Sequence, residues 1–391
     1  MLKNTGLKVM NVVGARPNFM KIAPLIREMA RYEDIQQTLV HTGQHYDANL
    51  SDVFFRDLAI PKPEFNLAVG PGSRDEQIMR ISEGFERVLL EGRPDLVVVV
   101  GDVNSTIACG QVARKHRVKL AHVEAGLRSF DLSMPEELNR VETDRISDFL
   151  FVTEESGMLN LTDERIEGKS YLVGNVMIDT LVHSLPAAEA STVLDELGVE
   201  EGNYMVATFH RPSNVDDERD LRNLIETIQR ICERVRLVLP LHPRTRNSLH
   251  AHGLLGSLAL IRNLVLTEPQ GYVDFLRLLS KSKAAITDSG GIQEESTYLG
   301  VPCLTMRMNT ERPITLTCGT NTLVGSDREK LLTEIDRILA NQYRISTIPE
   351  LWDGNAARRI VEVLKAEMHA SFVTTSRDKR HQRQPLELNS V

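Results

Sequence analysis

The sequence predicts an α/β protein made of two Rossmann-like domains, each with a doubly wound parallel sheet, facing each other across a cleft. Short runs rich in β-branched residues alternate with helical segments, and the alternation occurs in both halves of the 391-residue chain. The segment at 183–203, which includes a Pro/Ala/Ser-rich piece, separates the halves. The length of the chain agrees with two domains, because one domain usually takes roughly 100–200 residues.

The first half contains six expected strands. The third, DLVVVVGD, is almost wholly apolar, which is typical of a strand covered by helices on both faces of a parallel sheet. Helical segments such as 20–32 and 75–92 lie between strands, and strand–helix–strand units of this kind are right-handed. The six strands are expected at residues 7–14, 36–43, 95–102, 118–125, 148–153 and 170–175.

The second half repeats this pattern after a hinge expected near residues 176–186. A final helix is expected at 355–372. The polar tail that follows, 373–391, lacks apolar periodicity, which predicts disorder. The five strands of this half are expected at residues 204–209, 236–242, 263–269, 284–290 and 302–307.

The composition narrows the class of protein. A net charge of −8 argues against nucleic acid as a partner, because nonspecific binding to it needs clustered positive charge. A small anionic ligand is compatible, since arginines and helix N-termini act at short range. No apolar stretch approaches the ~18 residues of a membrane span, and the N-terminus has no signal-peptide pattern, so a cytoplasmic protein without a membrane partner is expected.

The cysteines predict structural thiols. No CxxC occurs, and no Cys/His pair has the spacing of a zinc site, so no metal is expected. All four are expected to be reduced, and they are Cys109, Cys232, Cys303 and Cys318.

The segment AAITDSGGIQEESTYLG, residues 284–300, is a candidate phosphate site. It places a strand, then Ser289, Gly290 and Gly291, then a helix, so free N–H groups and the helix dipole could bind a phosphate. Glu294 and Glu295 lie one turn further on, where a carboxylate suits ribose hydroxyls. The alternative is a plain N-cap with a tight glycine turn.

Basic residues follow several other strands. Arg16 and Lys21 open the helix after the first strand, although the segment is neither a GxGxxG fingerprint nor a Walker A loop, so nicotinamide and P-loop chemistry are not supported. A surface Arg and Lys is the alternative. The other strand ends carry Gln44, His45, His210, Arg211 and His242, and together the set looks like a receptor for a diphosphate.

Carboxylates follow two neighbouring strands of the first half. Asp102 ends the third strand and Glu124 comes 124 − 102 = 22 residues later, while Glu136 and Glu137 follow Pro135 at a helix start. If they share a cleft, their pKa values must separate, which would supply an acid and a base. The alternative is a solvated loop whose carboxylates pair with Arg128, Arg140 and Arg145.

Taken together, these motifs resemble those of the non-hydrolysing UDP-N-acetylglucosamine 2-epimerases over about residues 8–370. They occur in the family's order: GARPNFMKIAPL, TGQHYD, GDVNST, HVEAGLRS with MPEELNR, GNVMIDTL, TFHRPSN, PLHPR, TDSGGIQEES with LGVP, and TERP. The resemblance implies a glycosyltransferase-B-like architecture and a homodimer. The implied domains are 1–178 with a returning helix at 358–372, and 179–357.

The resemblance also implies a reaction. UDP-GlcNAc and UDP-ManNAc interconvert by elimination of UDP to an enzyme-held 2-acetamidoglucal and re-addition with inversion at C2, which supplies ManNAc-type sugars for cell-surface polysaccharides. No cofactor is needed. The carried-over catalytic residues are Asp102, Glu124, Glu136 and His210. The carried-over UDP contacts are Arg16, Lys21, His210, Ser289, Gly290, Gly291, Glu295 and Arg312.

Some members of the family carry a second, activating UDP-GlcNAc, and the matching positions here are Gln44, His45, Arg211 and His242. The chain departs from the common pattern, with Arg-Pro-Asn for Arg-Pro-Glu and His-Arg-Pro-Ser-Asn for His-Arg-Arg-Glu-Asn. These changes leave open the activator and the sugar, for instance a 2,3-diacetamido uronate. A hydrolysing 2-epimerase, a UDP-sugar glycosyltransferase of the same fold and a UDP-sugar sensor are the alternatives.

Overall fold

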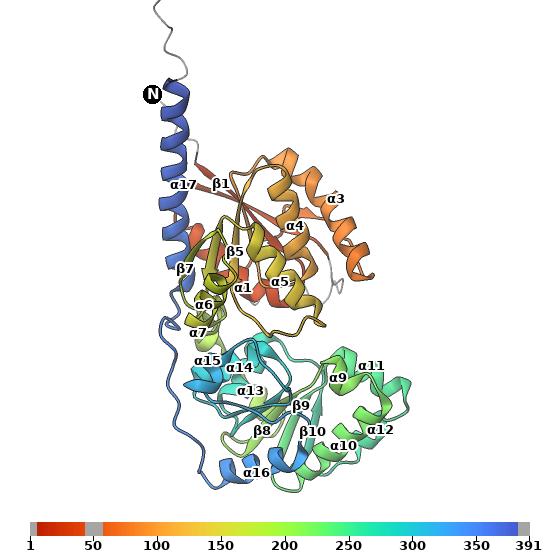
Figure 1. Cartoon of the computed structure of the whole chain (residues 1–391). Helices are drawn as coiled ribbons and strands as arrows, with labels where there is room; N and C mark the ends of the chain where they lie inside the picture. Colours follow the sequence, from red (N-terminus) through yellow and green to blue (C-terminus); the bar gives the residue numbers. More distant parts are fainter. Residues whose placement is uncertain (1–5, 44–57, 382–391) are drawn as a thin grey trace, which may run out of the picture.

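The computed structural model describes residues 6–43 and 58–381, which form two parallel sheets flanked by helices (Figure 1). The first sheet has the order β3-β2-β1-β4-β5-β6-β7 and the second β10-β9-β8-β11-β12-β13. In both, the strand order reverses beside the first strand of the sheet, which is the doubly wound arrangement that binds ligands beyond the strand C-termini. The predicted fold class is therefore confirmed.

The strands of the first sheet are β1 Leu7–Val13, β2 Ile35–His41, β3 Phe65–Asn66, β4 Leu96–Val100, β5 Lys119–Ala125, β6 Phe149–Val152 and β7 Lys169–Leu172. Those of the second are β8 Tyr204–Thr208, β9 Arg236–Pro240, β10 Leu264–Thr267, β11 Ala285–Thr287, β12 Cys303–Thr305 and β13 Asn321–Leu323. All eleven predicted strands are present. The sequence missed β3 and β13, because two or three residues are too few to show a strand period.

The helices covering the first sheet are α1 Arg16–Met29, α3 Arg74–Gly92, α4 Asn104–Lys115, α5 Pro135–Ile146, α6 Glu155–Asp163, α7 Val176–Glu189 and α17 Ala356–His381. Those of the second half are α8 Val193–Glu196, α9 Pro212–Val215, α10 Glu218–Cys232, α11 Pro243–Ala251, α12 Leu255–Ala259, α13 Tyr272–Ser280, α14 Gly290–Leu299, α15 Pro313–Thr317 and α16 Arg328–Leu339.

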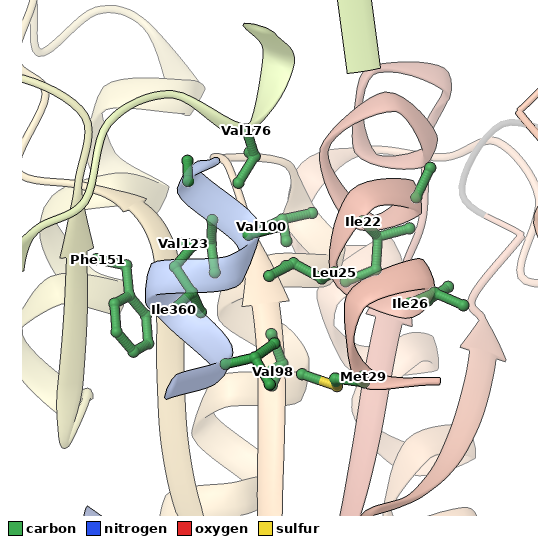
Figure 2. Close-up of a cluster of buried hydrophobic side chains, with 14 of the residues drawn as sticks. Ile22, Leu25, Ile26, Met29, Val98, Val100, Val123, Phe151, Val176 and Ile360 are labelled. Carbon is green, nitrogen blue, oxygen red and sulfur yellow. The ribbon is translucent and has the colours of Figure 1, made fainter. Parts of the chain in front are cut away.

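One core lies between a face of the first sheet and helices α1, α7 and α17. Figure 2 shows Ile22 and Leu25 of α1 meeting Val98 and Val100 of β4, with Ile360 of α17 on the other side. Burying each such side chain is worth roughly 1.5–3 kcal/mol. The last helix therefore packs on the sheet formed by the start of the chain, as the resemblance implied, while the exact domain boundaries stay a prediction.

The final helix is longer than predicted. It runs to His381, whereas a helix ending at residue 372 and a disordered segment from 373 were expected. The physical reason is that residues 373–381 contain neither Gly nor Pro, so nothing stops the helix even though the apolar period has ended. Figure 1 shows α17 at the edge of the N-terminal half, extending away from the other half. Residues 382–391 lie outside the described part of the chain.

Candidate active site

The carboxylate Glu124 lies in an irregular stretch of β5. The pairing register between β5 and β6 shifts between Val123 and Ala125, and Glu124 itself has a φ of +72°. A bulge of this kind re-aims a side chain, and bulges are common beside active sites. A left-handed glutamate costs conformational free energy, so the surrounding contacts must hold it in place.

Two cations hold the Glu124 carboxylate. Lys21 of α1 places its Nζ 2.6 Å from Oε2, and Arg312 places Nη2 3.2 Å from Oε1. Glu124 is almost completely buried. Because Lys21 comes from the first half and Arg312 from the second, the carboxylate lies at the junction of the two sheets.

Arg312 is the centre of an ion cluster that joins the halves. Its Nε lies 2.8 Å from Glu294 Oε1 and its Nη1 lies 3.3 Å from Glu311 Oε2. Arg307 in turn forms two 3.0 Å hydrogen bonds to Glu311. With Lys21 and with Arg211, whose Nη2 lies 3.7 Å from Glu311 Oε1, four cations surround the three carboxylates Glu124, Glu294 and Glu311.

The glycine at the start of α14 makes room for this arginine. A Cβ at Gly290 would lie 2.6 Å from Arg312 Nη1, so a larger residue would displace the guanidinium. Ser289 occupies the N-cap position, but its side chain does not cap the helix. The turn thus has the N-cap position that the alternative expected but not its side-chain hydrogen bond, and phosphate binding at this turn stays a prediction.

Asp102 follows β4 and is paired with Arg140 of α5. Burial opposes its ionisation, but the positive charges of Arg140, Lys21 and Arg312 outweigh burial and lower the pKa of Asp102. Asp102 and Glu124 therefore share the same two neighbouring cations, Lys21 and Arg312. The structure brings these two predicted carboxylates together.

The charged residues Arg128, Glu137 and Arg140 of the 122–140 segment are buried, although residues 130–136 between them are exposed or half-buried. Glu137 accepts hydrogen bonds from the backbone N–H groups of Ser129 and Phe130, both at 3.0 Å, and pairs with Arg140 at 2.7 Å. Arg128 is buried against Asp144 at 2.8 Å. The solvated-loop alternative is wrong for these residues, because their ion pairs are internal. Arg145, in contrast, is exposed at the end of α5.

Glu136 lies apart from this pair, half-buried in the first turn of α5. Its negative charge reaches Arg211 of the second half. Burial and the charge of Arg307 lower the pKa of Arg211, and Glu311, Glu136 and Asp288 oppose that shift. Glu136 is therefore within electrostatic range of Arg211, which follows β8 in the second half.

His210 is oriented by a carboxylate that the sequence analysis did not assign. Its Nδ1 lies 2.9 Å from Asp288, which also accepts hydrogen bonds from the N–H groups of His210 and Arg211 and from the Asn214 amide. Asp288 is fully buried, and these contacts outweigh burial and lower its pKa. The His210 ring is partly exposed and lies 5.2 Å from the ring of His242.

The two adjacent glutamates of α14 have different surroundings. Glu294 accepts a 2.9 Å hydrogen bond from Asn175 and meets Arg312, whereas Glu295 accepts one of 3.0 Å from the Tyr272 hydroxyl. Burial and the nearby Glu294 raise the pKa of Glu295 to about 8, while the Tyr272 hydrogen bond opposes the shift. Glu295, the expected ribose contact, is thus held mainly protonated at neutral pH.

The Glu295→Gln variant is expected to lose much of the pH dependence of stability. An unfolded glutamate titrates near pH 4.3, so between about pH 4.3 and 8 the folded state keeps a proton that the unfolded state has lost, and stability falls as pH rises. Glutamine still accepts from Tyr272 but cannot ionise. Urea unfolding should show a gain over wild type at both pH 5.5 and pH 8.5, and the gain should be about 2–4 kcal/mol larger at pH 8.5. Parallel pH curves for the two proteins would contradict this. Glu200→Gln, at an exposed position, is the control.

Some predicted residues are not located. Gln44 and His45 lie outside the described residues, and Arg16 begins α1 but its side chain is not described. In the described part of the chain, no group of three His, Cys, Asp or Glu could hold a metal ion, and no helix is long and apolar enough to span a membrane. Three cysteines are buried and Cys318 is half-buried, and all four are free thiols.

The sequence analysis missed Asp288 and Glu311 as site residues. The pattern alone left Glu294 and Glu295 undistinguished, and the resemblance assigned a ribose contact to Glu295 only. Asp288 and Glu311 stood inside quoted motifs, directly before Ser289 and Arg312. Their position after strand ends was the one available signal.

Two doubly wound domains, with a carboxylate pair on one and a glycine-opened helix on the other, define an enzyme of the glycosyltransferase-B-like class. The chain belongs to the UDP-N-acetylglucosamine 2-epimerase family, whose sequence model matches residues 27–365. It is therefore an epimerase, an isomerase, as the resemblance predicted.

Three relatives illustrate the match. The UDP-N-acetylglucosamine 2-epimerase homolog of Methanococcus maripaludis is 42% identical over 361 residues, 92% of this chain and 99% of the relative. The UDP-2,3-diacetamido-2,3-dideoxy-D-glucuronate 2-epimerase of Pseudomonas aeruginosa is 38% identical, with 92% and 99% covered. The crystal structure of Methanocaldococcus jannaschii UDP-GlcNAc 2-epimerase in complex with UDP-GlcNAc and UDP has a TM-score of 0.86 and 40% identity, with 92% and 100% covered.

Proposed function

We propose that this epimerase acts on UDP-N-acetylglucosamine without hydrolysing it, giving UDP-N-acetylmannosamine. The observation that carries the proposal is the pairing of Asp102 and Glu124, two carboxylates at neighbouring strand ends, with the N-terminus of α14 and His210 on the other half. Proton transfer at C2 needs carboxylates such as Asp102 and Glu124. Stabilising the departing diphosphate needs positive groups such as the N-terminus of α14 and His210.

In the proposed mechanism, a carboxylate takes the proton from C2 as the C1–O bond breaks. The electrons of the C2–H bond form the C1=C2 double bond, and the electron pair of the C1–O bond leaves with UDP. Adding UDP back at C1 and a proton to the other face of C2 completes the inversion. Asp102, Glu124 and Glu136 are the proposed proton-transfer groups, in an order that we leave open.

The diphosphate is the part of the substrate that gains charge. The N–H groups of the first turn of α14, beginning at Gly290 and Gly291, point outward from a helix end that carries roughly half a positive charge. His210, whose Nδ1 is held by Asp288, is proposed to stabilise the leaving phosphate from its other nitrogen. Arg16, Lys21 and Ser289 are proposed as further phosphate contacts.

A related sugar is the second candidate. The Pseudomonas aeruginosa relative named for a diacetamido glucuronate is 38% identical, close to the 42% of the relative named for UDP-N-acetylglucosamine 2-epimerase, so overall similarity does not separate the two. The homodimer and the second, activating UDP-GlcNAc also remain proposals. Of the four proposed activator residues, only Arg211 and His242 lie in the described part of the chain. Arg211 follows His210, and the His242 ring lies 5.2 Å from the His210 ring.

Incubation with UDP-GlcNAc in D2O, followed by NMR at C2, tests the proposal. We expect deuterium at C2 of both UDP-linked epimers, because reversible elimination exchanges that proton with solvent. Free ManNAc accumulating with UDP would instead mean hydrolysis. Unlabelled and unchanged UDP-GlcNAc, with exchange in the UDP-2,3-diacetamido uronate tested in parallel, would transfer the assignment to that sugar.

A further inference from the structure

A buried polar cluster lies directly behind the two carboxylate turns. His122, in the middle of β5, is fully buried, with Nδ1 2.7 Å from Asp144 Oδ1 and Nε2 2.8 Å from the carbonyl oxygen of Gly101. Asp144, on α5, also accepts the Gly126 N–H at 3.1 Å through Oδ2. The His122–Asp144 pair therefore contacts the backbone on both sides of the site.

Both contacted turns have unusual backbone conformations. Gly101, directly before Asp102, has a φ of +65°, and Gly126, two residues after Glu124, has a φ of +79°. Glu124 between them is itself left-handed, at +72°. Glycine adopts such angles without cost, whereas a left-handed glutamate costs free energy and persists only when neighbouring groups fix it. The pair fixes the chain around Glu124 through the Gly101 carbonyl and the Gly126 N–H.

The hydrogen-bond partners of His122 indicate which of its ring nitrogens carry a proton. The Gly101 carbonyl can only accept, so Nε2 carries a proton. Burial opposes ionisation of Asp144, but the hydrogen bonds and charges of His122 and Arg128 outweigh it and lower the pKa of Asp144, so Nδ1 also faces an acceptor. Arg128 pairs with Asp144 and, at 2.7 Å, with Glu164. The positive charges of His122 and Arg128 then balance the negative charges of Asp144 and Glu164.

We propose that His122 is a positioning residue: a buried imidazolium that, with Asp144, fixes the Gly101–Asp102 turn relative to the Glu124–Gly126 turn so that both carboxylates can reach one sugar carbon. This deepens the proposed function and rests on the roles proposed there for Asp102 and Glu124. His122 makes no contact with substrate in this scheme, and its effect passes through the two turns.

Three substitutions separate the two contacts. The amide nitrogen of His122→Gln can replace Nε2 and keep the Gly101 bond, that of His122→Asn can replace Nδ1 and keep the Asp144 bond, and His122→Phe keeps neither. We expect kcat for C2 exchange to fall about 10-fold in the first two and about 100-fold in the third, because small misplacements of reacting groups cost rates of that order. KM and the Kd for UDP should change less than about 2-fold, since His122 touches none of the proposed diphosphate contacts and most of them lie on the other half.

The matched control is Asn11→Leu. Asn11 is a fully buried polar residue of β1, hydrogen-bonded to Gln37 at 3.2 Å and away from both turns. The Asn11→Leu variant should have a lower unfolding temperature than wild type and an unchanged kcat. Wild-type kcat in His122→Phe, or an equal loss in Asn11→Leu, would overturn the proposal.

A second measurement does not need the variants to fold. In wild-type protein labelled with 15N-histidine, both ring nitrogens of His122 should show the shifts of a protonated imidazolium at neutral pH. The shifts of a neutral tautomer would overturn the proposal. If wild type fails to exchange C2 of any UDP-sugar tested, the proposed function fails, while the NMR signature still decides the state of His122 separately.

Discussion

Replacing Glu124 with glutamine is expected to reduce C2 proton exchange by about 10²–10⁴-fold, the usual contribution of a general acid or base. Glutamine keeps the size of the side chain and can still accept from Arg312, but it cannot take a proton. UDP binding should remain within a few-fold of wild type, because most of the proposed diphosphate contacts lie on the other half and Lys21 keeps its charge beside the glutamine. Deuterium incorporation at C2 measures the rate, and calorimetric titration with UDP measures the affinity.

The control for this substitution is Glu86→Gln. Glu86 also faces two basic partners, Lys115 at 2.7 Å and His116, but it lies outside the site between α3 and α4. The rate of C2 proton exchange in the Glu86→Gln variant should equal that of wild type. If Glu124→Gln retained full exchange, Glu124 would be removed from the mechanism, leaving Asp102 and Glu136 as the proton-transfer groups.

The candidate site residues that directly follow strands could be predicted from the sequence. In a parallel sheet, the carboxyl ends of the strands lie along one edge, so a periodic pattern that locates β4, β5 and β8 also groups the residues that follow them. Asp102 and Glu124 were found in this way and share Lys21 and Arg312 in the structure. His210 was found by the same signal.

What could not be predicted was which charges meet. Glu124 and Arg312 are 188 residues apart, and His210 and Asp288 are 78 apart, while periodicity reports only on neighbours along the chain. The division of labour between Glu294 and Glu295 was hidden for a related reason. Adjacent residues of a helix point about 100° apart, and the direction that meets Arg312 depends on the tertiary fold.

The solvated-loop hypothesis for residues 122–140 failed for an instructive reason. The charges do pair, as that hypothesis held, but with partners that the fold buries: Arg140 with Asp102 and Glu137, and Arg128 with Asp144. Sequence shows that opposite charges are present and close along the chain. It does not show that the β5 bulge and α5 turn these charged side chains into the protein interior. There the ion pairs fix the backbone and are not exposed to solvent.

Arg312→Leu is expected to lower the free energy of unfolding by about 3–5 kcal/mol, because removing one partner of a buried ion cluster leaves the others uncompensated. Arg312 contacts Glu124, Glu294 and Glu311, and its side chain is only 8% exposed. Urea unfolding at pH 7 measures the loss. The comparison is Arg328→Leu, which removes an arginine of the same half whose partner Glu226 is mostly exposed, and which should cost less than about 1 kcal/mol.

The loss should be recovered in part by removing a carboxylate as well. Burial already raises the pKa of Glu294 and Arg312 opposes that shift, so without the arginine Glu294 would take up a proton at a still higher pH. The deficit of Arg312→Leu should therefore shrink as pH falls toward 5, and adding Glu294→Gln should restore stability at pH 7 without acid. Additive losses in the double variant would mean that Arg312 and Glu294 act independently, which would contradict their coupling in one ion cluster at the junction of the two sheets.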